Sequence, residues 1–183
     1  MSAAPSTAGA SAADRPAHTP GSDHGPDLSR AQRGSAAAHR VSILLYSSDS
    51  ATRDAVRMAV GRRPSRDVEV ESWLECATSD AVLAAAGRGR YDIFVLDGEA
   101  SPYGGLGLCR ELKHSFYECP PVIVLTGRPQ DAWLASWSYA DQAVSHPLDP
   151  LAMADAVAAV ARGRFTPQTP AGTGPVGSGT PVH

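Results

Sequence analysis

The stretch 91–108, YDIFVLDGEASPYGGLGL, constrains the fold of this chain more than any other part of the sequence. Four consecutive apolar residues precede Asp97, and a glycine-rich loop follows it. Such an uninterrupted run is typical of a strand covered on both faces, as in a parallel sheet beneath helices. Asp97 then ends a central strand, at the edge where open α/β sheets place their chemistry. The same letters also fit a strand followed by an ordinary Asp-Gly turn, and this stretch alone leaves both interpretations open.

Segments of two kinds alternate along the middle of the chain. Strand patterns cover 41–46, 68–72, 91–97, 122–126 and 142–145. Helical patterns cover 50–60, with Ser50 as a suitable N-cap, and 79–86, 106–114, 131–139 and 151–161. Repeated β-α units with short connections require parallel strands and right-handed crossovers. We expect an α/β fold with a doubly wound (βα)5 sheet in the order 2-1-3-4-5, because the second strand is the most polar.

Composition divides the chain of 183 residues into one domain and two tails. Residues 40–163 carry the periodic pattern, whereas 1–39 and 164–183 are rich in Ala, Ser, Gly, Pro and Thr, and we expect both to be disordered. A net charge of -3 without a basic run argues against a nucleic-acid partner. No apolar run is long enough for a membrane, and no signal peptide is evident, so we expect a cytoplasmic protein with reduced cysteines.

The expected sheet order brings polar residues together at one edge. Strands 1, 3, 4 and 5 all end there. The polar residues at or just after these strand ends are Ser47, Ser48, Asp49, Asp97, Thr126 and His146.

This arrangement resembles the receiver domain of two-component response regulators. The resemblance rests on ILLYSSD at the first strand, FVLD at the third, Gly105 eight residues after Asp97, VLT at the fourth strand and SHP after the fifth. It implies the receiver, flavodoxin-like fold, with Asp97 at the position that accepts a phosphoryl group from a histidine kinase. It also implies that Thr126 and His146 lie at phosphate-contact positions, and that an acidic pair after the first strand holds Mg²⁺.

The sequence departs from that family at several of these positions. Ser47 and Ser48 replace the acidic pair, Asp49 comes one residue late, His146 stands in place of a lysine, and Ala143 in place of an aromatic residue. Mg²⁺ dehydrates reluctantly and prefers carboxylate ligands, so this set of residues is poor for it. We expect an atypical, non-enzymatic receiver without a cofactor, which signals by protein contact independently of phosphorylation. Nearly all basic residues are Arg, with Lys113 the single lysine, which indicates a GC-rich, actinobacterial genome.

Two other functions remain open from the sequence. In the first, Asp49 and Glu99 swing in beside Asp97, rebuild a metal site for Mg²⁺ and allow phosphorylation. In the second, the loop YSSDSAT holds the phosphate of a cofactor, as in flavodoxin-like proteins. The second alternative is weaker, because the loop lacks glycine and carries the negative charge of Asp49.

The expected fourth helix carries a candidate partner surface. Trp133 and Trp137 are four residues apart and share a face, and Tyr139 stands where a glycine usually ends the helix. These rings either form an exposed patch or fold over the sheet edge as part of the core. The resemblance implies contact with a histidine kinase or a second copy through the fourth helix, fifth strand and fifth helix.

Overall fold

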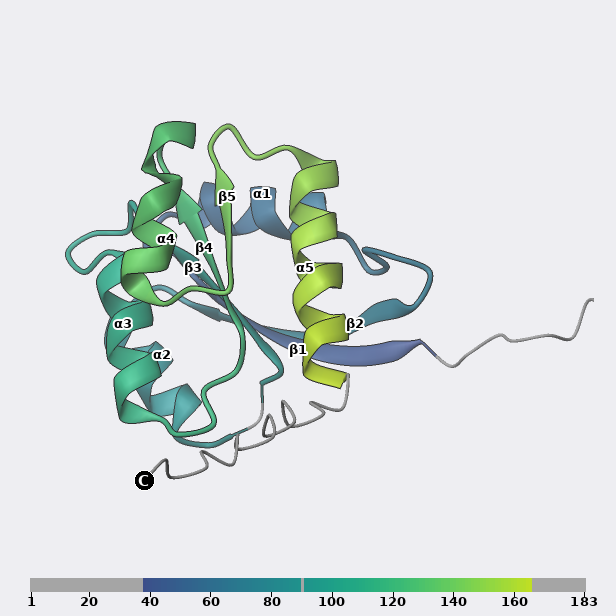
Figure 1. Cartoon of the computed structure of the whole chain (residues 1–183), viewed down its shortest axis with the longest axis horizontal. Coiled ribbons are helices and arrows are strands. Elements are labelled where there is room, and N and C mark those ends of the chain that lie inside the picture. The colour runs from purple at the N-terminus through teal and green to yellow at the C-terminus, as the bar shows by residue number, and fades with distance from the viewer. Residues whose placement is uncertain (1–37, 90, 166–183) are drawn as a thin grey trace, which may run out of the picture. The chain divides into compact units, whose positions relative to one another are not determined.

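A five-stranded parallel sheet with the order β2-β1-β3-β4-β5 forms the centre of the domain, as expected from the sequence. The computed structural model describes residues 38–89 and 91–165, and Figure 1 shows the sheet running between two groups of helices. The strands are β1 (His39–Tyr46), β2 (Val68–Cys76), β3 (Ile93–Asp97), β4 (Val122–Thr126) and β5 (Gln142–Ser145).

Helices cover both faces of this sheet (Figure 1). The helices are α1 (Ser50–Val60), α2 (Ser79–Ala86), α3 (Gly105–Ser115), the 3₁₀ turn η2 (Pro129–Ala132), α4 (Trp133–Ser138) and α5 (Pro150–Phe165). Buried side chains of α1 and α5 pack on one face, and those of α2, α3 and α4 pack on the other. Every residue of β3 and β4 is buried, which explains why their sequences are apolar up to the last residue.

Strand β2 is longer than the predicted 68–72 because a β-bulge changes its pattern of alternation. Val41 pairs with Val70 but Ser42 pairs with Ser72, so Glu71 is the extra residue. Val68 and Val70 face α1 and α5 before the bulge, and Trp73 faces the same way after it. The bulge therefore turns the odd-numbered residues of the second half of β2, including Glu75, toward α1.

The ends of the other elements differ from the prediction for identifiable reasons. β3 begins at Ile93 rather than residue 91, because the Asp92 carboxylate accepts from the backbone N–H of Ser42 at 2.9 Å at that end of the sheet. Helix α5 runs beyond the predicted 151–161, and ion pairs from Arg162 and Arg164 hold its last turn. The predicted tails 1–39 and 164–183 lie almost wholly outside the described residues.

Helix α4 is shorter than the predicted 131–139, since its first part is the 3₁₀ turn η2. Tyr139 ends α4 in the left-handed conformation, with φ of 62°, where glycine has no steric penalty. The expectation that this position is a C-terminal cap is confirmed. Its side chain lies against Arg110 and His114 of α3, which compensates part of the backbone strain.

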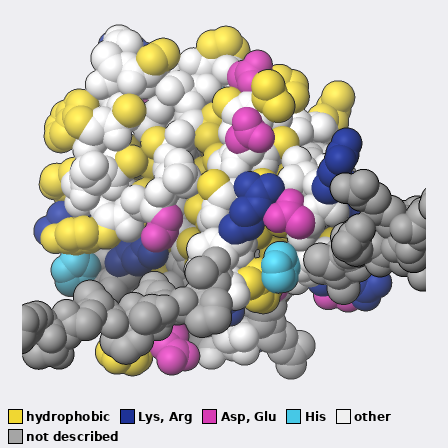
Figure 2. Space-filling view, turned by 45° about the vertical axis from the view of Figure 1, so that its right-hand side comes forward, with side chains coloured by type: hydrophobic (Ala, Val, Ile, Leu, Met, Phe, Trp, Pro, Cys, Tyr) yellow, Lys and Arg dark blue, Asp and Glu magenta, His cyan; other side chains and the backbone are white. Residues whose placement is uncertain are grey.

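The surface carries charges of both signs (Figure 2), and the three cysteines form no disulfide in the described residues. Figure 2 shows basic and acidic side chains next to each other, with hydrophobic ones among them, on the face that it presents. Cys76, Cys109 and Cys119 are free thiols, as predicted. Burial raises the pKa of Cys109 to about 11, so its thiol is unreactive at neutral pH. No helix within 38–89 and 91–165 has the length and hydropathy to cross a membrane.

Replacing Tyr139 tests the strain at the end of α4. Tyr139→Gly and Tyr139→Ala both lose the ring, but only Ala keeps a Cβ at positive φ, so we expect the Gly variant to be more stable by about 1 kcal/mol. Urea unfolding measures this difference. The same pair at the exposed helical position Ser136 is the control, and there Ala should be more stable by about 1 kcal/mol. If Ala were more stable than Gly at both positions, the assignment of backbone strain to residue 139 would be contradicted.

Candidate functional site

The candidate site lies at the carboxyl edge of the sheet, around the end of β3. Asp97 is the last residue of β3 and is only 4% exposed, while Thr126 at the end of β4 is 1% exposed. The N-terminus of α3 approaches closely, since a Cβ on Gly105 would lie 2.5 Å from the Asp97 carbonyl oxygen. Only glycine fits there, and this accounts for the spacing between Asp97 and Gly105.

The Asp97 carboxylate is bound by neutral donors. Ser47, which is fully buried, donates its hydroxyl to Oδ2 at 2.7 Å, and the backbone N–H of Glu99 donates to Oδ1 at 3.0 Å. The Ser47 Oγ itself accepts from the N–H of Asp49 at 3.1 Å. Burial, and next the Asp97 carboxylate, raise the pKa of neighbouring Tyr46. Each oxygen of this buried carboxylate therefore has a partner from the protein itself.

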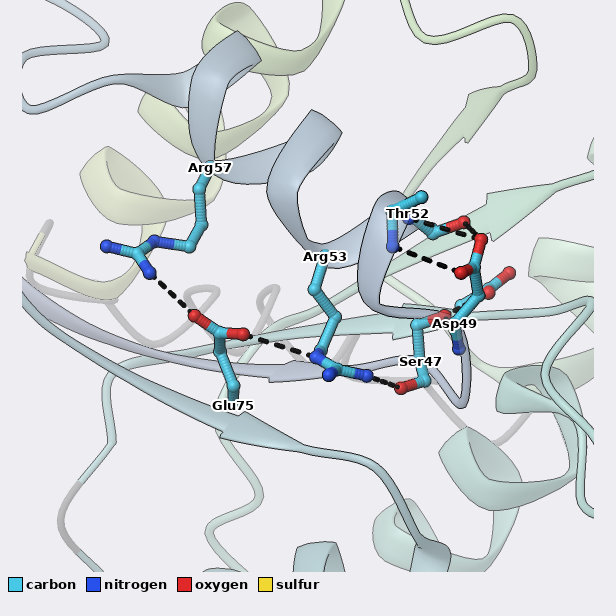
Figure 3. Close-up of polar contacts among 8 residues, drawn as sticks. Ser47, Asp49, Thr52, Arg53, Arg57 and Glu75 are labelled. Carbon is cyan, nitrogen blue, oxygen red and sulfur yellow. Dashed lines mark hydrogen bonds and ion pairs between the residues drawn. The ribbon is translucent and has the colours of Figure 1, made fainter.

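Asp49 is the N-cap of α1, so the assignment of that role to Ser50 was wrong by one residue (Figure 3). Its carboxylate accepts from the N–H groups of Ala51 at 3.0 Å and Thr52 at 3.3 Å, and from the Thr52 hydroxyl at 3.0 Å. A carboxylate satisfies these orphan donors better than a serine hydroxyl can. The N–H groups of Ala51 and Thr52, which the flavodoxin-like alternative would offer to a phosphate, have the Asp49 carboxylate as their acceptor.

Ser48 and Glu99 do not join Asp97 in an acidic cluster. The Ser48 Oγ accepts from the backbone N–H of Ser101 at 3.1 Å, across the loop that follows β3. The Glu99 carboxyl lies over Gly127, where a Cβ would come within 2.9 Å of its Cδ. Within the described part of the chain, no three His, Cys, Asp or Glu side chains are gathered as metal ligands. The structure thus joins Ser47 to Asp97 by a hydrogen bond, whereas Ser48 bonds to Ser101 and the Glu99 carboxyl lies beside the end of β4.

Thr126 and His146 lie side by side at the ends of β4 and β5. The backbone N–H of His146 donates to the Thr126 carbonyl at 2.8 Å, and the Thr126 hydroxyl donates to the Arg128 carbonyl at 3.3 Å. The ring of His146 forms no hydrogen bond or ion pair with other residues in the described ranges, and it is partly exposed. Both residues therefore occupy the expected place at this edge without contacting Asp97 by a hydrogen bond.

Sequence reasoning missed a cationic group on the other side of Ser47. Arg53 of α1 donates from Nη1 to the Ser47 carbonyl at 2.7 Å and from Nε to Glu75 at 3.2 Å (Figure 3). Arg57, one turn later, donates to the other Glu75 oxygen at 2.7 Å. The spacing of four residues from Asp49 to Arg53 to Arg57 was visible in the sequence, but their acceptor was not, because the bulge in β2 decides where Glu75 points.

Comparison with curated proteins supports the family directly. The chain is 45% identical over 120 residues to an uncharacterised response regulatory protein found in two strains of Mycobacterium tuberculosis. The match covers 66% of this chain and 90% of each relative. The chain belongs to the response regulator family. No protein-family model matches it.

Solved structures agree with the receiver fold. The receiver domain of the Francisella response regulator 1452 superposes with a TM-score of 0.57 at 14% identity, covering 67% of this chain and 97% of that one. The chemotaxis response regulator CheY4 of Vibrio cholerae gives a TM-score of 0.53 at 18% identity, covering 66% and 98%. These identities are low, so they establish the fold of this receiver and nothing about its chemistry.

The residues of this receiver do not fit Mg²⁺, the ion that the family resemblance implies. The ion prefers several oxygen ligands with carboxylates among them. Here Ser47 and Ser48 offer neutral hydroxyls, the Asp49 carboxylate caps α1, and the Arg53 guanidinium adds positive charge beside the loop. Asp97 keeps its carboxylate at the end of β3, and the Glu99 carboxyl lies over Gly127, the residue that follows Thr126.

The aromatic residues of α4 are exposed, which decides between the two sequence interpretations. Trp133, Trp137 and Tyr139 are 65%, 48% and 52% exposed. The Arg110 guanidinium of α3 lies 5.0 Å from the centre of the Trp137 ring and 5.2 Å from that of Tyr139, and it donates to the Trp137 carbonyl at 2.9 Å. The cation lies against both rings, a contact that contributes about 0.5–1 kcal/mol at an exposed site.

The capping role of Asp49 predicts a dependence of stability on pH. The Ala51 N–H, followed by the Thr52 hydroxyl, lowers the pKa of Asp49 below its ordinary value of 3.8. A lowered pKa stabilises the fold above pH 3.8, and this contribution disappears as the pH falls through the folded-state value. Asp49→Asn keeps an acceptor oxygen but does not titrate. Urea midpoints between pH 7 and pH 3 should fall more steeply for the native protein than for Asp49→Asn, whereas parallel curves would contradict this role.

Proposed function

We propose that this protein is an atypical receiver that signals through contact with other proteins and does not depend on phosphorylation of Asp97. The observation that carries this proposal is the hydrogen bond from the buried Ser47 hydroxyl to Asp97, at a position where the family resemblance implies a carboxylate. The proposed role is non-catalytic and is exercised in the cytoplasm.

The physical argument concerns charge. A carboxylate that attacks a phosphoryl group meets another anion, and a metal ion or fixed cations must neutralise the developing charge. The Asp49 carboxylate caps α1, the Glu99 carboxyl lies over Gly127 and completes no group of three metal ligands in the described residues, and His146 stands where the family has a lysine. Ala143, partly buried on β5, stands where the family has an aromatic residue, so no ring is present to change its position when Thr126 moves. The phosphorylation reaction therefore lacks neutralising charge, and the usual conformational response lacks its aromatic residue.

Intact-mass measurement after incubation with acetyl phosphate tests this proposal. We expect no phosphoryl adduct on the native protein, with or without Mg²⁺, because the charge on the incoming group is not neutralised. Asp97→Asn serves as the blank for modification elsewhere. A Mg²⁺-dependent adduct that is lost in Asp97→Asn would refute the proposal and would establish the phosphoacceptor alternative.

We propose the exposed aromatic residues of α4 as the contact surface, with a second copy or a histidine kinase as partner. Exposed Trp and Tyr rings that are already ordered lose little entropy on binding, and such residues dominate interface energetics. Trp137 and Tyr139 are ordered by Arg110, while Trp133 extends the same side of the helix.

Sedimentation velocity over a range of concentrations tests whether that partner is a second copy. We expect the native protein to self-associate and the variant Trp133→Ser/Trp137→Ser to sediment as a monomer. Tyr117→Ser removes a fully exposed ring from the loop between α3 and β4 and should behave like the native protein. A native protein that remains monomeric at every concentration would exclude self-association and leave a heterologous partner.

A further inference from the structure

Arg53 is the charged residue that contacts the site without taking part in the family's known chemistry. Its side chain is only 16% exposed, although it lies near the start of α1. Its guanidinium is divided between two acceptors, the Ser47 carbonyl on one side and the Glu75 carboxylate on the other (Figure 3). These two acceptors together restrain the position of the guanidinium.

Glu75 keeps this guanidinium in place. The bulge at Glu71 turns Glu75 toward α1, where it accepts from both Arg53 and Arg57. The hydrogen bond from Arg57, together with that from Arg53, lowers the pKa of Glu75, so its negative charge persists under ordinary conditions. Arg53 and Arg57 share the Glu75 carboxylate, and the Asp49 carboxylate on the same loop also interacts with Arg53, so the guanidinium of Arg53 is a cation held among anions beside the loop that follows β1.

Arg53 also acts on the orientation of Ser47. The guanidinium fixes the Ser47 carbonyl at 2.7 Å, and the hydroxyl of the same residue donates to Asp97 at 2.7 Å. The guanidinium is thus linked to the buried carboxylate through a single residue. A divalent cation that approached Asp97 from this loop would meet a fixed positive charge in a partly buried setting, where repulsion is stronger than in water.

We propose that Arg53 is a specificity-determining residue that closes this receiver to divalent cations. The inference rests on the proposed phosphorylation-independent function and deepens it, because it assigns the exclusion of metal to an internal cation in addition to the missing carboxylates. The Arg53 guanidinium bonds the Ser47 carbonyl and has no described hydrogen bond with Asp97, so it repels a metal ion at the loop without serving the carboxylate as a counter-ion. Arg57, which shares Glu75 but does not contact Ser47, has no such role.

The test adds one carboxylate and then removes the cation. Ser48→Asp is the host, because Ser48 is exposed and its replacement leaves the bond between Ser47 and Asp97 intact. Arg53→Met and the matched control Arg57→Met are each made in this host, since methionine keeps the length of the stem and removes the charge. Mn²⁺ affinity is measured by paramagnetic broadening of the Gly98 and Glu99 amide signals.

We expect Ser48→Asp/Arg53→Met to bind Mn²⁺ at least about tenfold more tightly than Ser48→Asp, whereas Ser48→Asp/Arg57→Met should stay within about twofold. Arg53→Gln in the same host keeps a donor for the Ser47 carbonyl, so it should show the gain even where Arg53→Met impairs folding. Equal affinities for the Arg53 and Arg57 variants, or no gain with Arg53→Gln, would overturn the proposal.

The native protein, incubated with acetyl phosphate and Mg²⁺ in the same series, separates this inference from the proposed function. An adduct on Asp97 of the native protein would overturn both. An unmodified native protein with equal affinities in the Arg53 and Arg57 variants would overturn the role of Arg53 alone.

Discussion

A carboxylate at the end of a strand that is buried on both faces must find donors, and this requirement organises the functional edge of the domain. Asp97 is 4% exposed, and leaving it unpaired would carry the desolvation cost of a buried charge. Ser47 and the Glu99 backbone supply the donors from within the protein. A neutral hydroxyl in contact with the acceptor satisfies the carboxylate without a metal ion, whereas two further carboxylates there would make one necessary. With Ser47 at this position, the donors that Asp97 needs come from the protein.

The second organising feature is the bulge in β2. One extra residue, Glu71, changes which side chains face α1 and so directs Glu75 to Arg53 and Arg57. Without the bulge, Glu75 would point to the opposite face of the sheet, since side chains alternate along a strand. A local irregularity at the sheet edge therefore positions a cation beside the loop that follows β1, and β-bulges are often found beside functional residues.

The sequence predicted the sheet order and the place of Asp97, because strands buried on both faces, β3 and β4, have uninterrupted apolar runs, and the segments between strands have apolar residues at helical spacing. It did not predict the length of β2, since the bulge interrupts the alternation on which strand recognition depends. Because the bulge was not predicted, the role of Arg53 was not predicted either, since its acceptors Ser47 and Glu75 come from separate strands. Side chains whose position depends on the register of neighbouring strands need the structure, whereas residues at strand ends do not.

Under the proposed function, the lack of a phosphoryl input has a consequence for the output surface. A signal can shift an equilibrium only between states that the protein possesses. Here Arg53 and Glu75 fix the loop after β1, Ala143 lacks the ring that would move, and Arg110 holds Trp137 and Tyr139 in one arrangement. Under that proposal no phosphoryl signal is needed, and information passes through the amount of the protein and the presence of its partner. The left-handed Tyr139 fits this view, because strain at a surface residue is retained where its ring is held for contact.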